Sequence, residues 1–575
     1  MHGVKKVQRT EEQKAAKEKE RQKKVQIYLA AKERLLFKQR SDQFDDEVLE
    51  LTEKLLSANP DIYTFWNFRK IALERLEQQS AQPVDTPAKE AVAALRSVFK
   101  HELTLTEVCL QENPKSYGAW HHRSWVLERM TEPDFKAELK LCNDALKLDE
   151  RNFHCWDHRR TVCKLADVEP EEELKFSDSK VNDNFSNYSA WHYRSSLLSK
   201  LRPDPEAKLP VEASVLNAEL ALATNAFYTD PEDQSAWFYT CWLFQEKADR
   251  PSNVFAVQLD SINKQVAVSL TKAVKMTSEL SFNGVAVKGH WSAPDANARF
   301  SRQWLFSSDQ SCSSDLFLEA ETVSIEHYGR FQLSFSNGSD GAFADWLDRP
   351  LLSSHVIGEQ PPEAIAAALN KQLLDCKQLI DMEPDNKWPL LTAVLCMKRL
   401  DCKAYKDDIV AGLDKLCSLD AKRHNFYSDL RSQLLIGLKL CEPERHPDHL
   451  VLMRSAVTNL PSAHLLTNVR RVDFSDNRLK SLAPLRFVLG LRDLTVNENQ
   501  LSSLEELRNH PNLESLAVAM NLFDRADSFE VLKSCRRFSK LIVCENAICN
   551  DENELKTLLE SFPHPKYRVI PFWLF

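Results

Sequence analysis

A pattern of apolar and polar positions with a fixed internal spacing recurs five times in the first 245 residues of the chain. Four full copies have an aromatic residue, a tryptophan three places later and an arginine three places after the tryptophan, and a fifth copy keeps the tryptophan. The tryptophans of the five copies are Trp66, Trp120, Trp156, Trp191 and Trp237. Such self-similarity, at a period of roughly 34 residues in the middle copies, is typical of stacked helical hairpins that bury their apolar faces against one another. The pattern therefore predicts an α-solenoid.

The copies differ in how complete they are. The aromatic positions hold Tyr63, Tyr117, Phe153 and Tyr188, and the arginine positions hold Arg69, Arg123, Arg159 and Arg194. The fifth copy has Gln234 and Thr240 at these two places. Residues at steps of three share one helix face, so we expect the aromatic residues and the tryptophans to pack between adjacent hairpins. The arginines then bond to carbonyls or carboxylates between layers, since a planar guanidinium suits a partly buried ion pair.

Other patterns divide the chain further. Residues 1–40 carry charges on all sides and predict a solvated helix before the hairpins of residues 41–248. Between residues 252 and 350 apolar and polar residues alternate, and the turn dipeptide Asn283-Gly284 favours a hairpin of strands. These residues predict an immunoglobulin-like β-sandwich. Helical spacing resumes over residues 358–442, where Trp388 marks a decayed sixth copy of the signature, so the sandwich interrupts the solenoid.

A second repeat occupies residues 445–575. Short segments place apolar residues at fixed distances before an asparagine, at Asn477, Asn499, Asn521 and Asn546. This is the pattern of leucine-rich repeats, in which the asparagine side chain bridges successive turns of backbone beside a short strand. The fold class that follows is mainly α: a solenoid of hairpins with an inserted β-sandwich and a C-terminal leucine-rich repeat domain.

Composition excludes several functions. The 575 residues carry a net charge of -9, which leaves no electrostatic footprint for nucleic acid at the level of the whole chain. Glycine is scarce, at 11 residues, and no glycine-rich phosphate loop or serine nucleophile motif occurs. The 14 cysteines have no paired spacing, and the sequence has neither a signal segment nor an apolar run of membrane-spanning length. We therefore expect a cytoplasmic protein with free thiols.

The hairpins offer candidate chemical groups but no complete active site. His154 and His158 stand four residues apart on a helix and could hold zinc, although they flank Trp156 within the signature, which favours a packing role. Lys115 occupies a position that varies between copies, two residues before Tyr117 and near a helix start. An ammonium and a phenol at a helix N-terminus can bind an anion such as diphosphate. On the residues alone, a solvated lysine is the simpler interpretation.

The signature, with Asn113-Pro114 before Tyr117, Trp120 and Arg123, resembles the repeats of protein prenyltransferase α subunits. The order of hairpins, sandwich and leucine-rich repeats is similar to that of the type II branch of this family, the Rab geranylgeranyltransferases, over the whole chain. In such heterodimers the α subunit wraps around a β subunit that holds the lipid and one zinc ion. The resemblance implies transfer of geranylgeranyl from geranylgeranyl diphosphate to C-terminal cysteines of Rab GTPases, which Rab escort protein presents.

The resemblance also implies roles for three residues. Lys115 and Tyr117 match a Lys-x-Tyr that adds to the diphosphate side of the active site in the β subunit, where positive charge stabilises the leaving group. His2 matches a histidine of the type II branch that can ligate the zinc ion of the β subunit. We expect the escort protein on the outer helices of the solenoid.

Two other functions remain open. Solenoids, sandwiches and leucine-rich repeats are all protein-binding folds, so the chain could be an interaction scaffold without catalytic association. The second alternative is the α subunit shared by farnesyltransferase and type I geranylgeranyltransferase, although that subunit has the hairpins alone. The fixed signature and the lysine at the variable position, Lys115, favour the half-enzyme over the scaffold.

Overall fold

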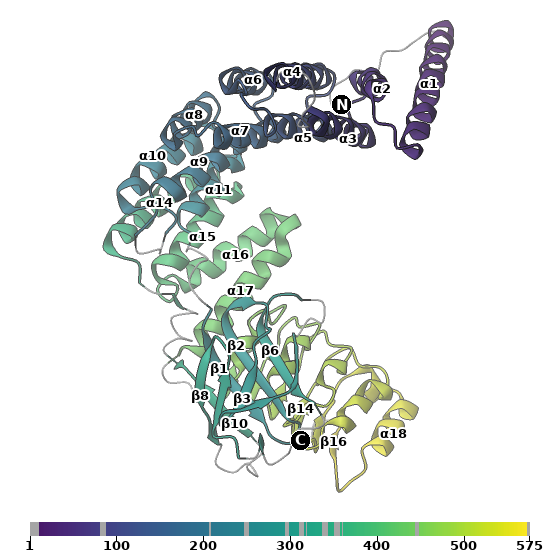
Figure 1. Cartoon of the computed structure of the whole chain (residues 1–575). Coiled ribbons are helices and arrows are strands. Elements are labelled where there is room, and N and C mark those ends of the chain that lie inside the picture. The colour runs from purple at the N-terminus through teal and green to yellow at the C-terminus, as the bar shows by residue number, and fades with distance from the viewer. Residues whose placement is uncertain are drawn as a thin grey trace. The chain divides into compact units, whose positions relative to one another are not determined.

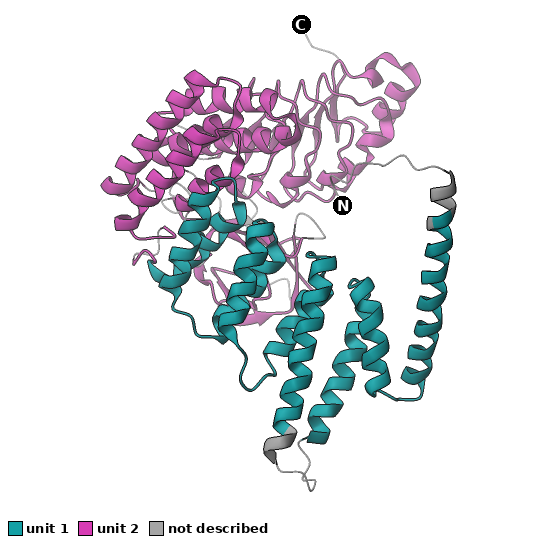
Figure 2. Cartoon of the chain, turned by 90° about the horizontal axis from the view of Figure 1, so that it is seen from above, with its two compact units in different colours: residues 1–202 teal, residues 203–575 magenta. Residues whose placement is uncertain are grey.

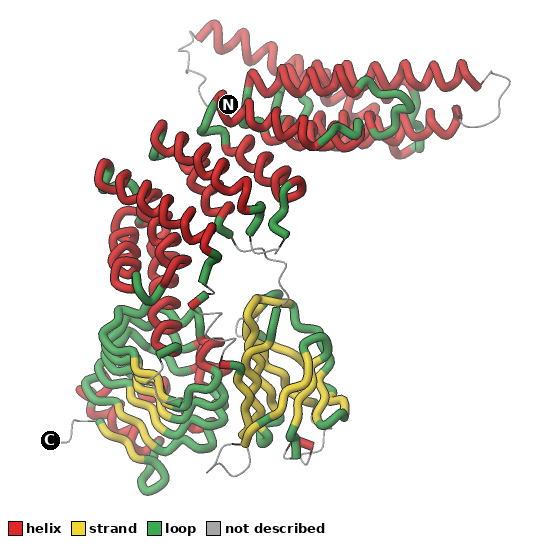
Figure 3. Tube along the Cα trace, turned by 90° about the vertical axis from the view of Figure 1, so that its left-hand side faces the viewer, coloured by secondary structure: helices red, strands yellow, loops and turns green. Residues whose placement is uncertain are grey.

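The computed structural model describes residues 11–80, 88–205, 209–245, 252–293, 298–309, 316–317, 319–335, 343–349, 357–358, 360–442 and 448–571 (Figure 1). Contacts along the chain divide it into two compact units, Met1–Arg202 and Pro203–Phe575 (Figure 2). In its described residues the first unit is helical, whereas the second combines helices, antiparallel strands and a parallel coil (Figure 3). Within those described ranges, no helix is long and apolar enough to cross a membrane.

The helices of the first unit pair into hairpins after a long N-terminal helix. Their bounds are α1 Glu11–Arg40, α2 Asp46–Ala58, α3 Tyr63–Ser80, α4 Ala88–Glu112, α5 Tyr117–Leu127, α6 Phe135–Leu148, α7 Phe153–Leu165, α8 Pro170–Asp183 and α9 Tyr188–Leu201. The hairpins are α2–α3, α4–α5, α6–α7 and α8–α9. Figure 1 shows α4 and α6 in one layer and α3, α5 and α7 in the other, so each hairpin contributes one helix to each layer.

The tryptophan of each signature fixes the segment that leads into its helix. The indole Nε1 donates to the carbonyl oxygen six residues earlier, over 2.7 to 3.0 Å. The accepting residues are Pro60, Pro114, Glu150, Phe185 and Pro231. All five tryptophans are buried, so their indole N–H groups need an acceptor within the protein. The bond to the carbonyl therefore fixes the conformation of the segment before the helix in every copy.

The aromatic position of the signature behaves differently from the prediction. Tyr63, Tyr117, Phe153 and Tyr188 are the first residues of α3, α5, α7 and α9, and they expose 63%, 69%, 51% and 51% of their surface. The prediction that they pack between hairpins is therefore wrong. The first residue of a helix lies at the edge of the layer, where the neighbouring hairpin covers only part of its side chain. Tyr117 and Phe153 still touch, with ring centroids 6.1 Å apart.

In the second unit, two hairpins that are distant in sequence stack on each other. The helices are α10 Ala213–Thr229, α11 Gln234–Leu243, α14 Glu363–Met382, α15 Lys387–Asp401, α16 Lys406–Leu419 and α17 His424–Leu440. The Asn386 side chain donates to the carbonyl oxygen of Pro231 over 3.0 Å, and the rings of Phe238 and Trp388 lie 5.4 Å apart. The strands between these hairpins in sequence are therefore an insertion into the stack.

The inserted strands form two antiparallel sheets. Their bounds are β1 Val254–Asp260, β2 Gln265–Val274, β3 Leu280–Phe282, β4 Val285–Val287, β5 Gly289–Ser292, β6 Ser301–Ser308, β7 Thr322–Ile325, β8 Gly329–Gln332, β9 Ser334–Phe335 and β10 Phe343–Leu347. One sheet has the order β5-β6-β2-β1-β10-β9 and the other β4-β3-β7-β8. Asn283 and Gly284, with φ of 47° and 86°, make the predicted tight turn between β3 and β4.

The C-terminal residues form a parallel coil. Its strands pair in chain order and are β11 His449–Val451, β12 Arg471–Asp473, β13 Asp493–Thr495, β14 Ser515–Ala517, β15 Lys540–Ile542 and β16 Arg568–Ile570, with α18 Glu552–Ser561 before the last. The predicted asparagines bridge its turns. The Asn499 amide donates to the carbonyls of Phe474 and Val496, and its oxygen accepts from the Leu479 N–H. Asn477, Asn521 and Asn546 make the equivalent bonds.

One face of the sandwich is covered by the parallel coil. Ser269 Oγ lies 2.7 Å from Thr467 Oγ1, and Gln303 donates to the carbonyl of Phe487 over 3.2 Å. Ala267, Leu305, Phe487 and Leu489 form a small buried apolar cluster at this contact. Every residue of β1 is buried as a result, instead of alternating between core and solvent.

Candidate functional site

Lys115 lies in the segment that enters α5, and this segment is held to the preceding hairpin. Asn113 accepts from the Lys115 N–H over 3.1 Å. Ser116 caps α5 by accepting from the Ala119 N–H, and its hydroxyl donates to the carbonyl oxygen of Pro60 over 3.1 Å. The backbone around Lys115 is thus fixed, while its side chain extends from the N-terminal end of the helix.

The Lys115 side chain is 66% exposed and its ammonium lies 3.1 Å from a carboxylate oxygen of Asp149. An ion pair this open to solvent stabilises the fold by about 0–1 kcal/mol. The ammonium can therefore leave Asp149 for a more strongly charged anion at little cost. The partial positive charge at the N-terminus of α5 favours an anion in the same place.

Tyr117 stands beside Lys115 on a support of two side chains from the next hairpin. The edge of its ring meets His154, with centroids 4.1 Å apart, and its other neighbour is Phe153. His154 is buried, and burial lowers its pKa; the nearby charge of Lys115 acts in the same direction, whereas Asp157 opposes it. A neutral imidazole thus packs under the phenol and leaves the hydroxyl of this exposed residue in solvent.

His154 and His158 do not point to a shared zinc site, because each has a partner within the hairpins. His158 Nε2 lies 2.7 Å from a carboxylate oxygen of Glu138, and its Nδ1 lies 2.8 Å from the hydroxyl of Ser124. Both ring nitrogens are therefore engaged within the hairpins. Over the described part of the chain, no group of three or more His, Cys, Asp and Glu residues is arranged to hold a metal ion.

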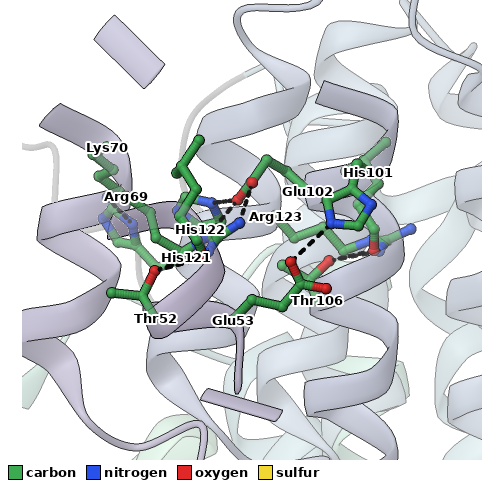
Figure 4. Close-up of polar contacts among 12 residues, drawn as sticks. Thr52, Glu53, Arg69, Lys70, His101, Glu102, Thr106, His121, His122 and Arg123 are labelled. Carbon is green, nitrogen blue, oxygen red and sulfur yellow. Dashed lines mark hydrogen bonds and ion pairs between the residues drawn. The ribbon is translucent and has the colours of Figure 1, made fainter. Parts of the chain in front are cut away.

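A buried carboxylate joins each hairpin to the next. Glu102 on α4 accepts 2.9 Å from Arg69 Nε on α3 and 2.8 Å from His122 Nε2 on α5, and the Arg69 guanidinium also reaches Thr52 Oγ1 on α2 (Figure 4). Burial alone would raise the pKa of Glu102, but the bonds from His122 and Arg69 outweigh it and lower the pKa to about 2. The predicted ion pairs of the signature arginines are confirmed.

The same arrangement recurs along the layers. The Glu138 carboxylate bonds to Arg123 and His158, and the Glu173 carboxylate accepts hydrogen bonds from Arg159 and Tyr193. These glutamates were missed by the sequence reasoning, although a signal exists: glutamate stands eighteen residues before four of the tryptophans, at positions 102, 138, 173 and 219. The repeated clamp sets the spacing of the hairpins and therefore of the residues at their ends, Lys115 and Tyr117 included.

A glycine permits the close approach of two hairpins beside this site. A Cβ added to Gly118 would lie 2.5 Å from Trp66 Cδ1 and 2.6 Å from Trp66 Nε1. No Cβ atom tolerates such distances, so the indole of the first signature needs glycine directly after Tyr117 in the second. His2, the third predicted site residue, lies outside the described residues.

Five segments of the chain match the repeat family described as protein prenyltransferase alpha subunit repeat, at residues 45–76, 99–130, 135–166, 170–201 and 216–247. The chain is 36% identical over 579 residues to geranylgeranyl transferase type-2 subunit alpha of Sus scrofa, which covers 98% of this chain and 99% of that protein. The Homo sapiens protein of the same name is 36% identical over 578 residues, with the same coverage. A Dictyostelium discoideum protein of that name is 38% identical over 253 residues, 42% of this chain and 74% of its own length.

Proposed function

The chain belongs to the family of geranylgeranyl transferase type-2 alpha subunits, and we propose from this membership that it is the alpha half of a heterodimer that attaches geranylgeranyl to Rab GTPases. The observation that carries the proposal is the match to these relatives along 98% of the chain, through hairpins, sandwich and coil alike. The alpha subunit of farnesyltransferase and type I enzymes would account for the hairpins alone. We assign the parallel coil to the leucine-rich repeat class and expect the enzyme in the cytoplasm.

In the proposed reaction, the thiolate sulfur of a Rab cysteine attacks the first carbon of the isoprenoid. The bond from that carbon to the diphosphate oxygen breaks, and the diphosphate leaves with the electron pair. A zinc ion in the beta subunit, when bound, would lower the pKa of the thiol. His2 of this chain would ligate the same ion at the position that the thiolate uses, and would therefore compete with the substrate. The Rab escort protein presents the substrate, and it binds this chain on the layer formed by the first helices of the hairpins.

Lys115 and Tyr117 contribute to the departure of the diphosphate in this proposal. Negative charge accumulates on the leaving oxygen as the bond breaks, and a preorganised cation and a hydroxyl donor stabilise it. The geometry supports these roles in two ways. The only described partner of the Lys115 ammonium is a half-buried carboxylate, that of Asp149, which it can exchange for the leaving group. His154 and Phe153 meanwhile hold the Tyr117 ring in place.

The beta subunit needs a surface on this chain that includes both residues. We define the aromatic face as the exposed side of α3, α5, α7 and α9 that carries Tyr63, Tyr117, Phe153 and Tyr188. Exposed tyrosines are enriched at the centres of protein interfaces, because they bury a large apolar ring at low entropic cost and retain a polar group. We therefore propose that the beta subunit binds the aromatic face.

The test is co-expression with a type-2 beta subunit, followed by transfer of labelled geranylgeranyl to a Rab protein in the presence of escort protein. We expect a stable heterodimer, and transfer only when both subunits are present. Lys115→Ala should leave assembly intact and lower kcat about tenfold to a hundredfold, as expected when one charged contact to a leaving group is lost. Lys556→Ala, at an exposed lysine of α18 that pairs with Glu560, is the matched control and should transfer like the wild type.

Failure to form a heterodimer would favour the interaction scaffold over the half-enzyme. A heterodimer in which Lys115→Ala retains the full kcat would leave the function intact and remove Lys115 from the diphosphate side of the site.

A further inference from the structure

Two nitrogen atoms meet on the exposed side of the second-helix layer in the first unit. Lys70 lies on α3 and His121 on α5, and the Lys70 Nζ is 3.0 Å from the His121 Nδ1 (Figure 4). Lys70 follows Tyr63 by seven residues, and His121 follows Tyr117 by four. These spacings place the pair on the same helix faces as the exposed tyrosines, so it belongs to the aromatic face.

Aromatic and charged side chains surround the pair. The centroid of the Trp125 ring lies 5.6 Å from the Lys70 Nζ and 4.0 Å from the guanidinium carbon of Arg129. Arg129 is itself neutralised by Glu74 and Glu77, at 3.4 and 3.6 Å. No carboxylate among the described side chains forms such an ion pair with Lys70. Arg129 is thus paired directly with carboxylates of the chain, whereas Lys70 feels Glu74 and Glu128 only at longer range.

The surroundings of Lys70 disfavour its charge. Burial, followed by the charge of Arg129, lowers the pKa of Lys70, while Glu74 and Glu128 oppose the shift. Burial and the charge of Lys70 also lower the pKa of His121. At neutral pH the imidazole is therefore uncharged and accepts one N–H from the ammonium, which keeps two further donors. A partly buried ammonium with unused donors and no carboxylate bonded to it is stabilised when an anion reaches it.

We propose that Lys70 and His121 form a carboxylate-binding pair on the aromatic face, which takes an aspartate or glutamate side chain of the beta subunit. The inference rests on the proposed function, because that function supplies the partner. Charge complementarity selects the occupant: the pair offers one cation with directed donors, and its partner must bring one negative charge. Continuity with Tyr63 and Tyr117 places the pair inside the surface proposed for the beta subunit.

A carboxylate fits this position better than a phosphate group of the substrate. Lys70 lies seven residues into α3, about 10 Å along the helix from its first residue. The unpaired N–H groups of a helix N-terminus, which phosphate sites commonly use, are therefore out of reach. A carboxylate can accept two hydrogen bonds, and the Lys70 ammonium has two left to donate after His121 accepts the first.

The test measures the dissociation constant of the heterodimer as a function of salt concentration. Lys70→Met should weaken binding about tenfold to a hundredfold, because it leaves a carboxylate of the partner buried without its cation. It should also flatten the dependence of affinity on salt. Lys70→Arg keeps the charge and should stay within about threefold of wild type. Lys54→Met, an exposed lysine on α2 in the other layer, is the matched control and should change nothing.

A second measurement identifies the partner atom. A zero-length carbodiimide joins an amine to a carboxylate in contact with it, so treatment of the heterodimer should yield a peptide that links Lys70 to an acidic residue of the beta subunit. The same peptide should be absent from Lys70→Met.

The outcomes separate the two proposals. If the wild-type chain does not bind the beta subunit, the proposed function fails and the partner assigned to the pair fails with it. If wild type binds, but Lys70→Met binds as tightly with the same salt dependence and no cross-link forms, the carboxylate-binding pair alone is overturned. A change in the KM for geranylgeranyl diphosphate with unchanged heterodimer affinity would also overturn it, because the pair would then face the substrate.

Discussion

Glu102 illustrates how much single side chains matter in this solenoid. Its carboxylate is buried between three helices, and a charge there is stable only because Arg69 and His122 both reach it. The lowered pKa, about 2, has a definite sign for stability. The ionised form contributes stability above the ordinary pKa of a glutamate, and that contribution is lost as the pH falls from about 4.5 towards 2.

Arg69→Leu should lower the free energy of unfolding of the first unit by about 3–5 kcal/mol at pH 7, because Glu102 keeps its charge and loses its main counter-charge. The pKa of Glu102 should rise towards that of an unfolded glutamate, so the loss of stability as the pH falls from about 4.5 towards 2 should be smaller than in the wild type. Urea unfolding at pH 7 and an acid titration, both followed by the fluorescence of the buried tryptophans, measure the two effects.

Arg34→Leu is the comparison for this substitution, since Arg34 pairs with Glu47 at the exposed surface and Glu47 retains Lys38. Its effect should stay within about 1 kcal/mol. Equal losses for the two arginines would show that the buried clamp is no stronger than a surface ion pair.

At the scale of the element, the hairpins depend on the fit between one signature and the next. The indole of Trp66 binds the Pro60 carbonyl, Ser116 donates to the same carbonyl, and Gly118 leaves room for the ring. These three contacts set the position of α5 against α3. Lys115 and Tyr117 are the two sequence neighbours of Ser116, so the same contacts position the candidate site.

Gly118→Ala should destabilise the first unit by about 1–3 kcal/mol, because the new methyl group overlaps the Trp66 ring and one of the two helices must move. The movement should also lower transfer activity in the heterodimer, since it displaces the start of α5. Ser189→Ala, at the equivalent position of α9, removes a hydroxyl without adding bulk and serves as the control. Thermal unfolding and the transfer assay provide the readouts, and an unchanged Gly118→Ala would mean that the two helices have room to separate.

Much of this fold could be predicted from the sequence, and the failures have physical causes. The buried tryptophans and arginines and the bridging asparagines follow from fixed spacing, because each must find the same partner in every repeat. The exposure of Tyr63 could not be read from spacing, which gives the face of a helix but not the point where the neighbouring hairpin stops covering it. Lys70 and His121 lie 51 residues apart in sequence, and only the crossing of α3 and α5 brings them together.

At the scale of the whole molecule, the match to the relatives extends through the sandwich and the parallel coil as well as the hairpins. Within the second unit these two parts share a buried contact, in which Gln303 and Ser269 bond to the coil and Leu305 packs against Phe487. We therefore expect the sandwich and the coil to behave as one cooperative body and not as two independent modules.

Leu305→Asp tests this coupling, because it places an uncompensated carboxylate in the apolar contact at a cost of about 3 kcal/mol or more. Hydrogen exchange measured by mass spectrometry should show loss of protection in peptides from both the sandwich and the coil. Val285→Asp, on the other sheet at an exposed position, should leave both unchanged. Loss of protection in the sandwich alone would mean that the two parts are held independently.

The pairing of β1 with β10 has a consequence for how the chain folds. Ala256 lies opposite Leu347, so the insertion begins and ends on adjacent strands. If residues 244–362 were unfolded, they would form a long flexible loop. This loop must close before α14 and α15 can pack on α10 and α11, and its closure is entropically costly and slow. Once the sandwich has formed, its own strands hold the two ends together, and the remaining search is short. Early folding of the insertion thus brings α11 and α14 close together before their two hairpins stack.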